Sequence, residues 1–115
     1  MPKFPLSGLT VVELGHSVAA PYAGLVLAEL GADVIKVERP NGGDPTREWG
    51  PPFTDGVATT FHAYNRSKRS VVIDLRDESQ RTKLLSFIEN SADVVLQNLR
   101  AGVADRMGLG ADALR

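Results

Sequence analysis

The residues best suited to chemistry are two arginines that each follow a short apolar run. Arg39 comes after residues 34–37 and next to Glu38, and Arg76 comes after residues 71–75. A guanidinium grips a phosphate through two parallel hydrogen bonds, so Arg39 favours a phosphorylated ribose, as in coenzyme A or NADP. Glu38 could instead bind an unphosphorylated ribose, as the acidic residue of NAD-binding folds does. The alternative without a ligand is a surface ion pair between Glu38 and Arg39.

Other segments carry weaker signals. Residues 65–70 concentrate positive charge, which is usually a solvated face but also suits the phosphates of a nucleotide-like cofactor. Residues 15–20 precede a predicted helix, whose free N–H groups and dipole favour an anionic ligand. They lack the G-x-G-x-x-G pattern of dinucleotide-binding proteins, and their small side chains equally suit close packing of helix on strand. His16 and His62 could be acid–base residues, but without an evident partner we expect them to be loop or packing residues.

These segments are positioned by alternating strands and helices. Four apolar runs rich in β-branched residues are expected to form strands, at 9–14, 34–37, 71–75 and 92–96. One helix is expected to begin at Pro21 and end before Gly31, and another to open at Asp77. This alternation predicts an α/β fold, a Rossmann-like parallel sheet with flanking helices. In such sheets, ligands bind beyond the carboxyl ends of the strands.

Two segments differ from this pattern. Residues 40–55 are rich in Pro and Gly, so we expect an irregular but ordered loop whose Trp49 and Phe53 pack on the surface. The tail at residues 101–115 is expected to form short helical turns. Only two substantial helices are evident for four strands, whereas a parallel sheet normally has both faces covered. We therefore expect one sheet face to need further chain or a partner.

The composition excludes several classes of protein. The 115 residues are 43% hydrophobic and 23% charged, with a formal net charge of -1, which argues against nucleic acid as a partner. There is no cysteine for a disulfide or a thiolate metal site, and two histidines are too few to predict a metal. No apolar run approaches the roughly 20 residues of a membrane span, and the N-terminus lacks a secretory core. We expect a cytoplasmic protein that binds no membrane.

The order of motifs along the chain closely resembles the start of class III CoA-transferases, the CaiB/BaiF family that includes formyl-CoA transferases. The resemblance covers nearly the whole chain without a gap. It rests on residues 6–14, 20–23, 27–40, 43–47, 65–70, 74–76, 92–95, 97–103 and 107–110.

This resemblance implies an enzyme that moves coenzyme A from an acyl-CoA thioester to a carboxylic acid acceptor. In the family an aspartate attacks the thioester, giving a mixed anhydride and then an aspartyl-CoA thioester. That aspartate belongs to a later segment, so residues 1–115 are expected to form an incomplete N-terminal CoA-binding α/β domain. We expect this domain to contain no catalytic residue and to be inactive alone. The family fold also implies an interlocked homodimer.

The resemblance further implies a set of residues that contact CoA. Val18 and Ala19 would line the pantetheine arm, and Arg39 would grip the adenosine end. Residues near adenine would be Ile73, Asp74, Leu75 and Arg76, the last close to the 3′-phosphate. A further wall would be formed by Asn98, Leu99 and Arg100, with Arg106 on the phosphates. Relatives often have Gln at the position of Val18 and Phe at that of Leu99, which puts a catalytic role for position 18 in doubt.

Three other functions stay open from the sequence. An α-methylacyl-CoA racemase would look similar up to Pro40, but racemases usually shorten the stretch that here runs from Trp49 to Phe61. A dinucleotide-dependent Rossmann oxidoreductase is disfavoured by the missing glycine pattern and by Arg39. A module that binds CoA or a nucleotide without catalysis is the third alternative.

Overall fold

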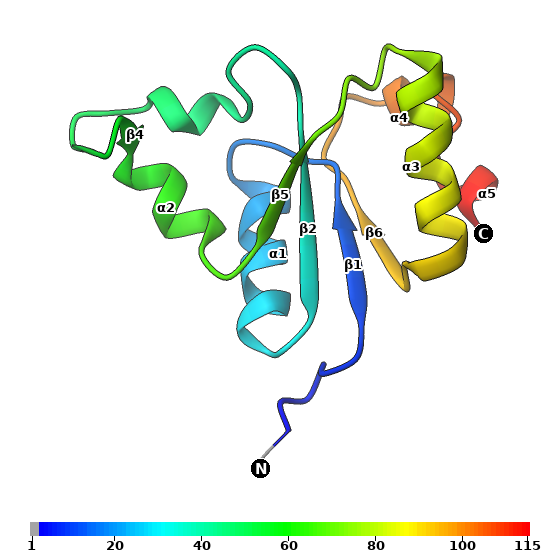
Figure 1. Ribbon diagram of the computed structural model, residues 1–115, viewed down its shortest axis with the longest axis horizontal. Helices are drawn as coiled ribbons and strands as arrows, with labels where there is room; N and C mark the ends of the chain where they lie inside the picture. Colours follow the sequence, from blue (N-terminus) through cyan, green and yellow to red (C-terminus); the bar gives the residue numbers. More distant parts are fainter. Residues whose placement is uncertain (1–2) are drawn as a thin grey trace.

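A four-stranded parallel sheet forms the centre of the molecule in the computed structural model, which describes residues 3–115 (Figure 1). Its strands are β1 (Thr10–Glu13), β2 (Asp33–Glu38), β5 (Arg69–Val72) and β6 (Val94–Leu96), in the order β5-β2-β1-β6. In chain order this is 3-2-1-4, the first four positions of the Rossmann order 3-2-1-4-5-6. The chain builds outward from β1 on one side and then returns to place β6 on the other. The predicted α/β fold is therefore confirmed.

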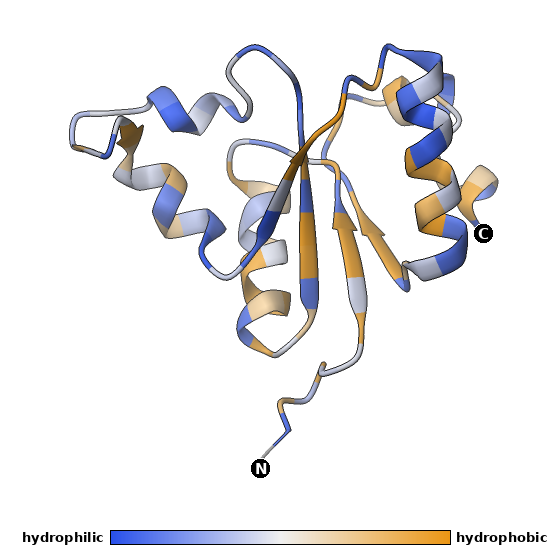
Figure 2. Ribbon diagram, viewed as in Figure 1, coloured by the Kyte–Doolittle hydropathy of each residue, from blue (hydrophilic) through white to orange (hydrophobic). Residues whose placement is uncertain are grey.

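Helices lie on both faces of this sheet. On one side are α1 (Ala19–Glu29) and α2 (Thr59–Asn65), and on the other are α3 (Glu78–Ser91), α4 (Val103–Arg106) and α5 (Ala111–Leu114) (Figure 1). Strand alternation divides the core accordingly, since successive side chains point to opposite faces. Val12 and Leu14 pack with Leu84 and Ile88 of α3, whereas Val11 and Val34 pack with Leu27 and Ala28 of α1. Apolar residues are frequent along the central strands β1 and β2 (Figure 2).

One sheet face was expected to need further chain or a partner to cover it, but helices within residues 3–115 pack on both faces. The two long helices lie on opposite faces, so one helix is enough to cover the two central strands of each face. Exposed apolar surface is found at the sheet edges instead. All four residues of β5 are exposed, including Val71 and Val72, and Val94 of β6 is exposed at the other edge.

Several element boundaries also differ from the prediction. The first helix begins at Ala19 rather than Pro21. The third strand ends at Val72 rather than Leu75, because the chain leaves the sheet to form the loop before α3. Residues 40–55 contain a 3-10 turn, η1 (Pro45–Glu48), and the strand β3 (Phe53–Thr54), which pairs with β4 (Val57–Ala58). Trp49 and Phe53 are about half exposed (48% and 52%), as expected for side chains that pack on the surface rather than in the core.

The helix α2 was not predicted at all. Its sequence, TTFHAYN, consists mainly of β-branched and aromatic residues with weak helix propensity, and it is stabilised by packing against α1. Tyr64 of α2 contacts Tyr22 of α1 edge to face, and Phe61 is buried beneath the guanidinium of Arg47. None of the helices within residues 3–115 is long and apolar enough to span a bilayer.

Candidate functional site

A cleft of about 530 Å³ opens where the carboxyl ends of the parallel strands meet. This is where ligands bind in open α/β sheets. Its walls come from the segments that follow β1, β2, β5 and β6, which are brought together only by the fold. The lining residues after β1 and β2 are Leu14 to His16, Val37 to Asn41, and Gly43 to Pro45. Those after β5 and β6 are Ile73, Asp74, Leu75, Arg76 and Leu99.

Arg39 lies in the wall formed by the segment after β2, and its side chain is exposed. Its Nε donates to the carbonyl oxygen of Gly43 at 2.9 Å, and it takes part in no ion pair within residues 3–115. Glu38 pairs with Arg47 instead, with 2.7 Å between Arg47 Nη2 and Glu38 Oε2. The alternative of a surface Glu38–Arg39 pair is therefore wrong. The terminal nitrogens of Arg39 are available to an anionic ligand.

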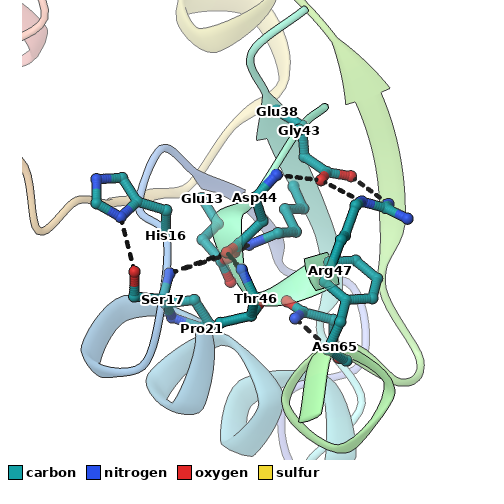
Figure 3. A network of polar contacts seen from close by, with 12 residues as sticks. Glu13, His16, Ser17, Pro21, Glu38, Gly43, Asp44, Thr46, Arg47 and Asn65 are labelled. Atoms are coloured by element: carbon teal, nitrogen blue, oxygen red, sulfur yellow. Dashed lines mark hydrogen bonds and ion pairs between the residues drawn. The ribbon is translucent and has the colours of Figure 1, made fainter. Parts of the chain in front are cut away.

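Glu38 is unsuited to bind a ribose because its carboxylate is already saturated. It is 4% exposed and accepts from Nε and Nη2 of Arg47 and from the backbone N–H of Asp44 (Figure 3). The hydroxyl of Ser70 is a further donor. A carboxylate has about four acceptor sites, and all are occupied here. Burial raises the pKa of Glu38, but the hydrogen bonds from Arg47, Ser70 and Asp44 outweigh it and lower the pKa to about 2. This geometry argues against the NAD-type interpretation.

The segment after β5 forms the opposite wall and is held by α3. The backbone N–H of Ile73 donates to the carbonyl of Glu38 at 3.0 Å. The N–H of Asp74 donates to Gln80 Oε1 at 2.8 Å, and Asp74 Oδ1 accepts from the N–H of Arg76 at 3.0 Å. The Arg76 side chain is 86% exposed, with its Nε 3.4 Å from Asp74 Oδ1. Arg76 and Arg39 therefore line one cleft from different strands, as predicted.

Asn98 clamps two loops together across the point where the strand order reverses. Its Nδ2 donates to the carbonyl of His16 at 2.9 Å, and its Oδ1 accepts from the N–H of His16 at 3.0 Å. Gly15 is needed beside it, because a Cβ there would collide with the Asn98 side chain. The side-chain amide of Asn98 is thus committed to holding the wall rather than free for a ligand.

The remaining predicted residues lie outside the cleft lining. They are Val18, Ala19, Arg100 and Arg106, all of which are exposed. Their contacts with CoA stay predictions.

None of residues 65–70 lines the cleft, and the charges of this basic run are paired with carboxylates of the fold. Arg66 pairs with Glu29 at 3.3 Å, and Arg69 pairs with Asp33, at the start of β2, at 2.6 Å. Lys68 is buried, with its Nζ 2.7 Å from Glu13 Oε1. Each charge therefore already has a carboxylate partner. The reason is topological, because the run ends in the first half of β5, whereas the cleft forms at the carboxyl ends of the strands.

A buried charge network lies beneath α1, and the sequence interpretation missed it. Glu13 Oε2 is 2.9 Å from Lys36 Nζ, which is 2.8 Å from Asp44 Oδ2, and Lys68 pairs with the other oxygen of Glu13. These four side chains are at most 2% exposed. The signal was present, since Glu13 and Lys36 occupy inward positions of apolar strands.

The network contains two cations and two anions, so its formal charges balance. Lys68 Nζ also donates to the carbonyl of Pro21 and to Asn65 Oδ1, both at 2.8 Å, which fixes α1 and α2 over the sheet. Burial lowers the pKa of Lys68, and the adjacent Glu13 carboxylate offsets this only in part. Within residues 3–115, no group of three or more His, Asp or Glu side chains could hold a metal ion.

Comparisons with known proteins agree on one family. The profile of CoA-transferase family III matches residues 6–115. A succinate–glutarate CoA-transferase of Agrobacterium fabrum is 45% identical over 98% of this chain, and an acetyl-CoA:oxalate CoA-transferase of Acetobacter aceti is 40% identical over 98%. The crystal structure of a CaiB/BaiF family protein from Brucella suis superposes with a TM-score of 0.90 at 47% identity over 98% of the chain. The chain spans 30%, 28% and 30% of these three proteins, respectively.

Proposed function

This chain belongs to CoA-transferase family III, and we propose that it forms the N-terminal CoA-binding α/β domain of an enzyme that transfers CoA between carboxylic acids. The observation that carries this proposal is a cleft lined by both Arg39, which follows β2, and Arg76, in the segment after β5. The saturated carboxylate of Glu38 favours a phosphorylated ligand over an NAD-type ribose.

The order of the strands suggests how CoA lies in the cleft. Arg39 follows β2 and Arg76 follows β5, so the phosphorylated adenosine end belongs over this half of the sheet. Apolar surface for the adenine ring is offered there by Ile73 and Leu75. The pantetheine arm would then run toward β1 and β6, past Gly15 and Leu99, and on toward Val18 and Ala19. Arg100 and Arg106 would contact CoA from beyond β6.

The reaction we propose is nucleophilic catalysis by a carboxylate. An aspartate outside residues 1–115 would attack the thioester carbonyl and release the CoA thiolate, leaving a mixed anhydride. The thiolate would then attack the aspartyl carbonyl and release the donor acid, which yields an aspartyl-CoA thioester for the acceptor acid. This domain contributes binding and orientation, and the complete enzyme would be an interlocked homodimer. The transferase names of the relatives support this reaction over racemisation.

The phosphate contact can be tested by replacing Arg39 with Ala in the complete enzyme. Charge-assisted bonds to a phosphate contribute roughly 1.5–3 kcal/mol, so the dissociation constant of CoA should rise at least about tenfold. The dissociation constant of 3′-dephospho-CoA should change little. The matched control is Arg69→Ala, which removes an arginine that pairs with Asp33 away from the cleft.

Calorimetric titration of both ligands against both variants decides the matter. If Arg39→Ala weakens the binding of CoA and 3′-dephospho-CoA equally, or weakens the binding of neither, Arg39 does not bind the 3′-phosphate. A wild-type enzyme that binds NADP(H) more tightly than CoA would overturn the proposed function itself.

A further inference from the structure

The loop between β1 and α1 adopts a conformation that its own residues do not favour. Ser17 has a φ of 69°, in the left-handed region that non-glycine residues seldom occupy. Such a residue persists only when its surroundings hold it in place. His16 is tied to Asn98 on the β6 side. The second anchor is Asp44, on the β2 side.

Asp44 holds Ser17 through its backbone. The N–H of Ser17 donates to both carboxylate oxygens of Asp44, at 3.2 Å to Oδ1 and 3.3 Å to Oδ2 (Figure 3). Asp44 also lines the cleft beside Gly43, and the loop lines it at Gly15 and His16. One carboxylate therefore joins two walls of the cleft.

Asp44 is itself fixed from three directions. Its Oδ1 accepts from the N–H and the hydroxyl of Thr46 at 2.9 and 2.8 Å, and its Oδ2 lies 2.8 Å from Lys36 Nζ. Lys36 is in turn held by Glu13. Burial raises the pKa of Asp44, but Lys36 and Thr46 outweigh it and hold the pKa below its usual value. The carboxylate thus stays an anion with little freedom to move.

We propose that Asp44 is a positioning residue that preorganises the β1–α1 loop for the arm of CoA. This inference rests on the proposed function, in which the adenosine end lies over β2 and β5 and the arm runs toward β1. A loop already fixed before binding loses less conformational entropy when the ligand arrives. It also holds the reacting end of the substrate in one place, which is a requirement for fast chemistry.

Two replacements of Asp44 separate positioning from stability. Asp44→Ala removes the acceptor for Ser17 and the partner of Lys36. Asp44→Asn keeps an oxygen at the Oδ1 position, which can still accept hydrogen bonds from the N–H groups of Thr46 and Ser17. It loses the negative charge that pairs with Lys36. Both variants should therefore lower Tm, whereas only the first should free the loop. Val34→Ala, a fully buried change at the other end of β2, is the control for lost stability alone.

The measurement is calorimetric titration of the complete enzyme with CoA and with adenosine 3′,5′-bisphosphate, which lacks the arm. Asp44→Ala should raise the dissociation constant of CoA at least about tenfold, equivalent to about 1.4 kcal/mol. The dissociation constant of the bisphosphate should stay unchanged. Asp44→Asn and Val34→Ala should bind CoA nearly as the wild type does. The inference is overturned if Asp44→Ala binds CoA as tightly as Val34→Ala does, or if Asp44→Asn binds CoA as weakly as Asp44→Ala. It is also overturned if Asp44→Ala loses as much affinity for the bisphosphate as for CoA.

A second measurement needs no variant and covers the case in which Asp44→Ala does not fold. Hydrogen exchange in the wild-type enzyme should show the Ser17 amide protected before CoA is added, because Asp44 accepts its N–H. A Ser17 amide that becomes protected only on CoA binding would refute preorganisation while leaving CoA binding intact. A wild type that binds neither CoA nor the bisphosphate would refute the proposed function instead.

Discussion

Gly24 provides a sharp test of the buried charge network, because α1 packs on Glu13 at this position. A Cβ at residue 24 would collide with Glu13 Oε1 and would lie 3.2 Å from Glu13 Cδ and 3.3 Å from Lys68 Cε. The carboxylate cannot easily move aside. It is fully buried, and Oε1 makes no hydrogen bond within the described residues, so it depends on its 2.7 Å ion pair with Lys68.

Two opposing effects set the expected size of the change. In a helix interior, Ala is more favourable than Gly by about 1 kcal/mol, so propensity alone predicts that Gly24→Ala stabilises α1. Breaking a buried ion pair costs roughly 3–5 kcal/mol. If the methyl group displaces the Glu13 carboxylate from Lys68, the net loss should be about 2–4 kcal/mol.

The assay is urea denaturation of the complete enzyme, followed by circular dichroism. Thr82→Ala is the control, since Thr82 is exposed within α3 and its replacement tests helix propensity without the network. It should stabilise by a few tenths of a kcal/mol. Should Gly24→Ala prove as stable as the wild type or more so, the close packing of α1 on the charged pair would be refuted.

Three further predictions concern pH, the loops and the isolated chain. Because the pKa of Glu38 falls from 4.5 to about 2 on folding, its stabilisation is fully present above pH 4.5 and is lost as the pH falls toward 2. This amounts to at most roughly 3 kcal/mol, and a Glu38→Gln variant whose stability still declines like the wild type in acid urea titrations would contradict it. Asn98→Ala should cost about 1–2 kcal/mol of stability in urea and weaken CoA binding, whereas Asn90→Ala, on the exposed side of α3, should leave CoA binding unchanged. Residues 1–115 alone should not transfer CoA from succinyl-CoA to glutarate, and turnover above background would show that a nucleophile lies within them.

The sequence predicted those parts of the site that follow from local pattern and general geometry. Apolar runs located the strands, and parallel strands necessarily bring their carboxyl ends together, so Arg39 and Arg76 were expected at one cleft. The partner of Glu38 was not predictable in this way. Arg47 reaches it from a 3-10 turn while its guanidinium lies 3.9 Å from the centre of the Phe61 ring, a contact that depends on the unpredicted helix α2.

The basic run at residues 65–70 shows a second limit of sequence reasoning. A cluster of charges indicates affinity for anions but not which anions the fold supplies. Here the register places Arg69 opposite Ile35, near Asp33, and the length of the Lys68 side chain carries its charge under α1. Charge runs therefore identify ligand sites only once strand order and register are known.

The balance of charge beneath α1 also constrains how this domain can change during evolution. Loss of any one member of Glu13, Lys36, Lys68 and Asp44 would leave a net charge in an interior that excludes water, which is costly. A change of two opposite charges to neutral side chains of similar size would preserve the balance, and such replacement is often neutral in energy. We therefore expect substitutions here to be accepted in compensating pairs, so that these positions covary among homologues while the exposed pair of Arg69 and Asp33 drifts independently.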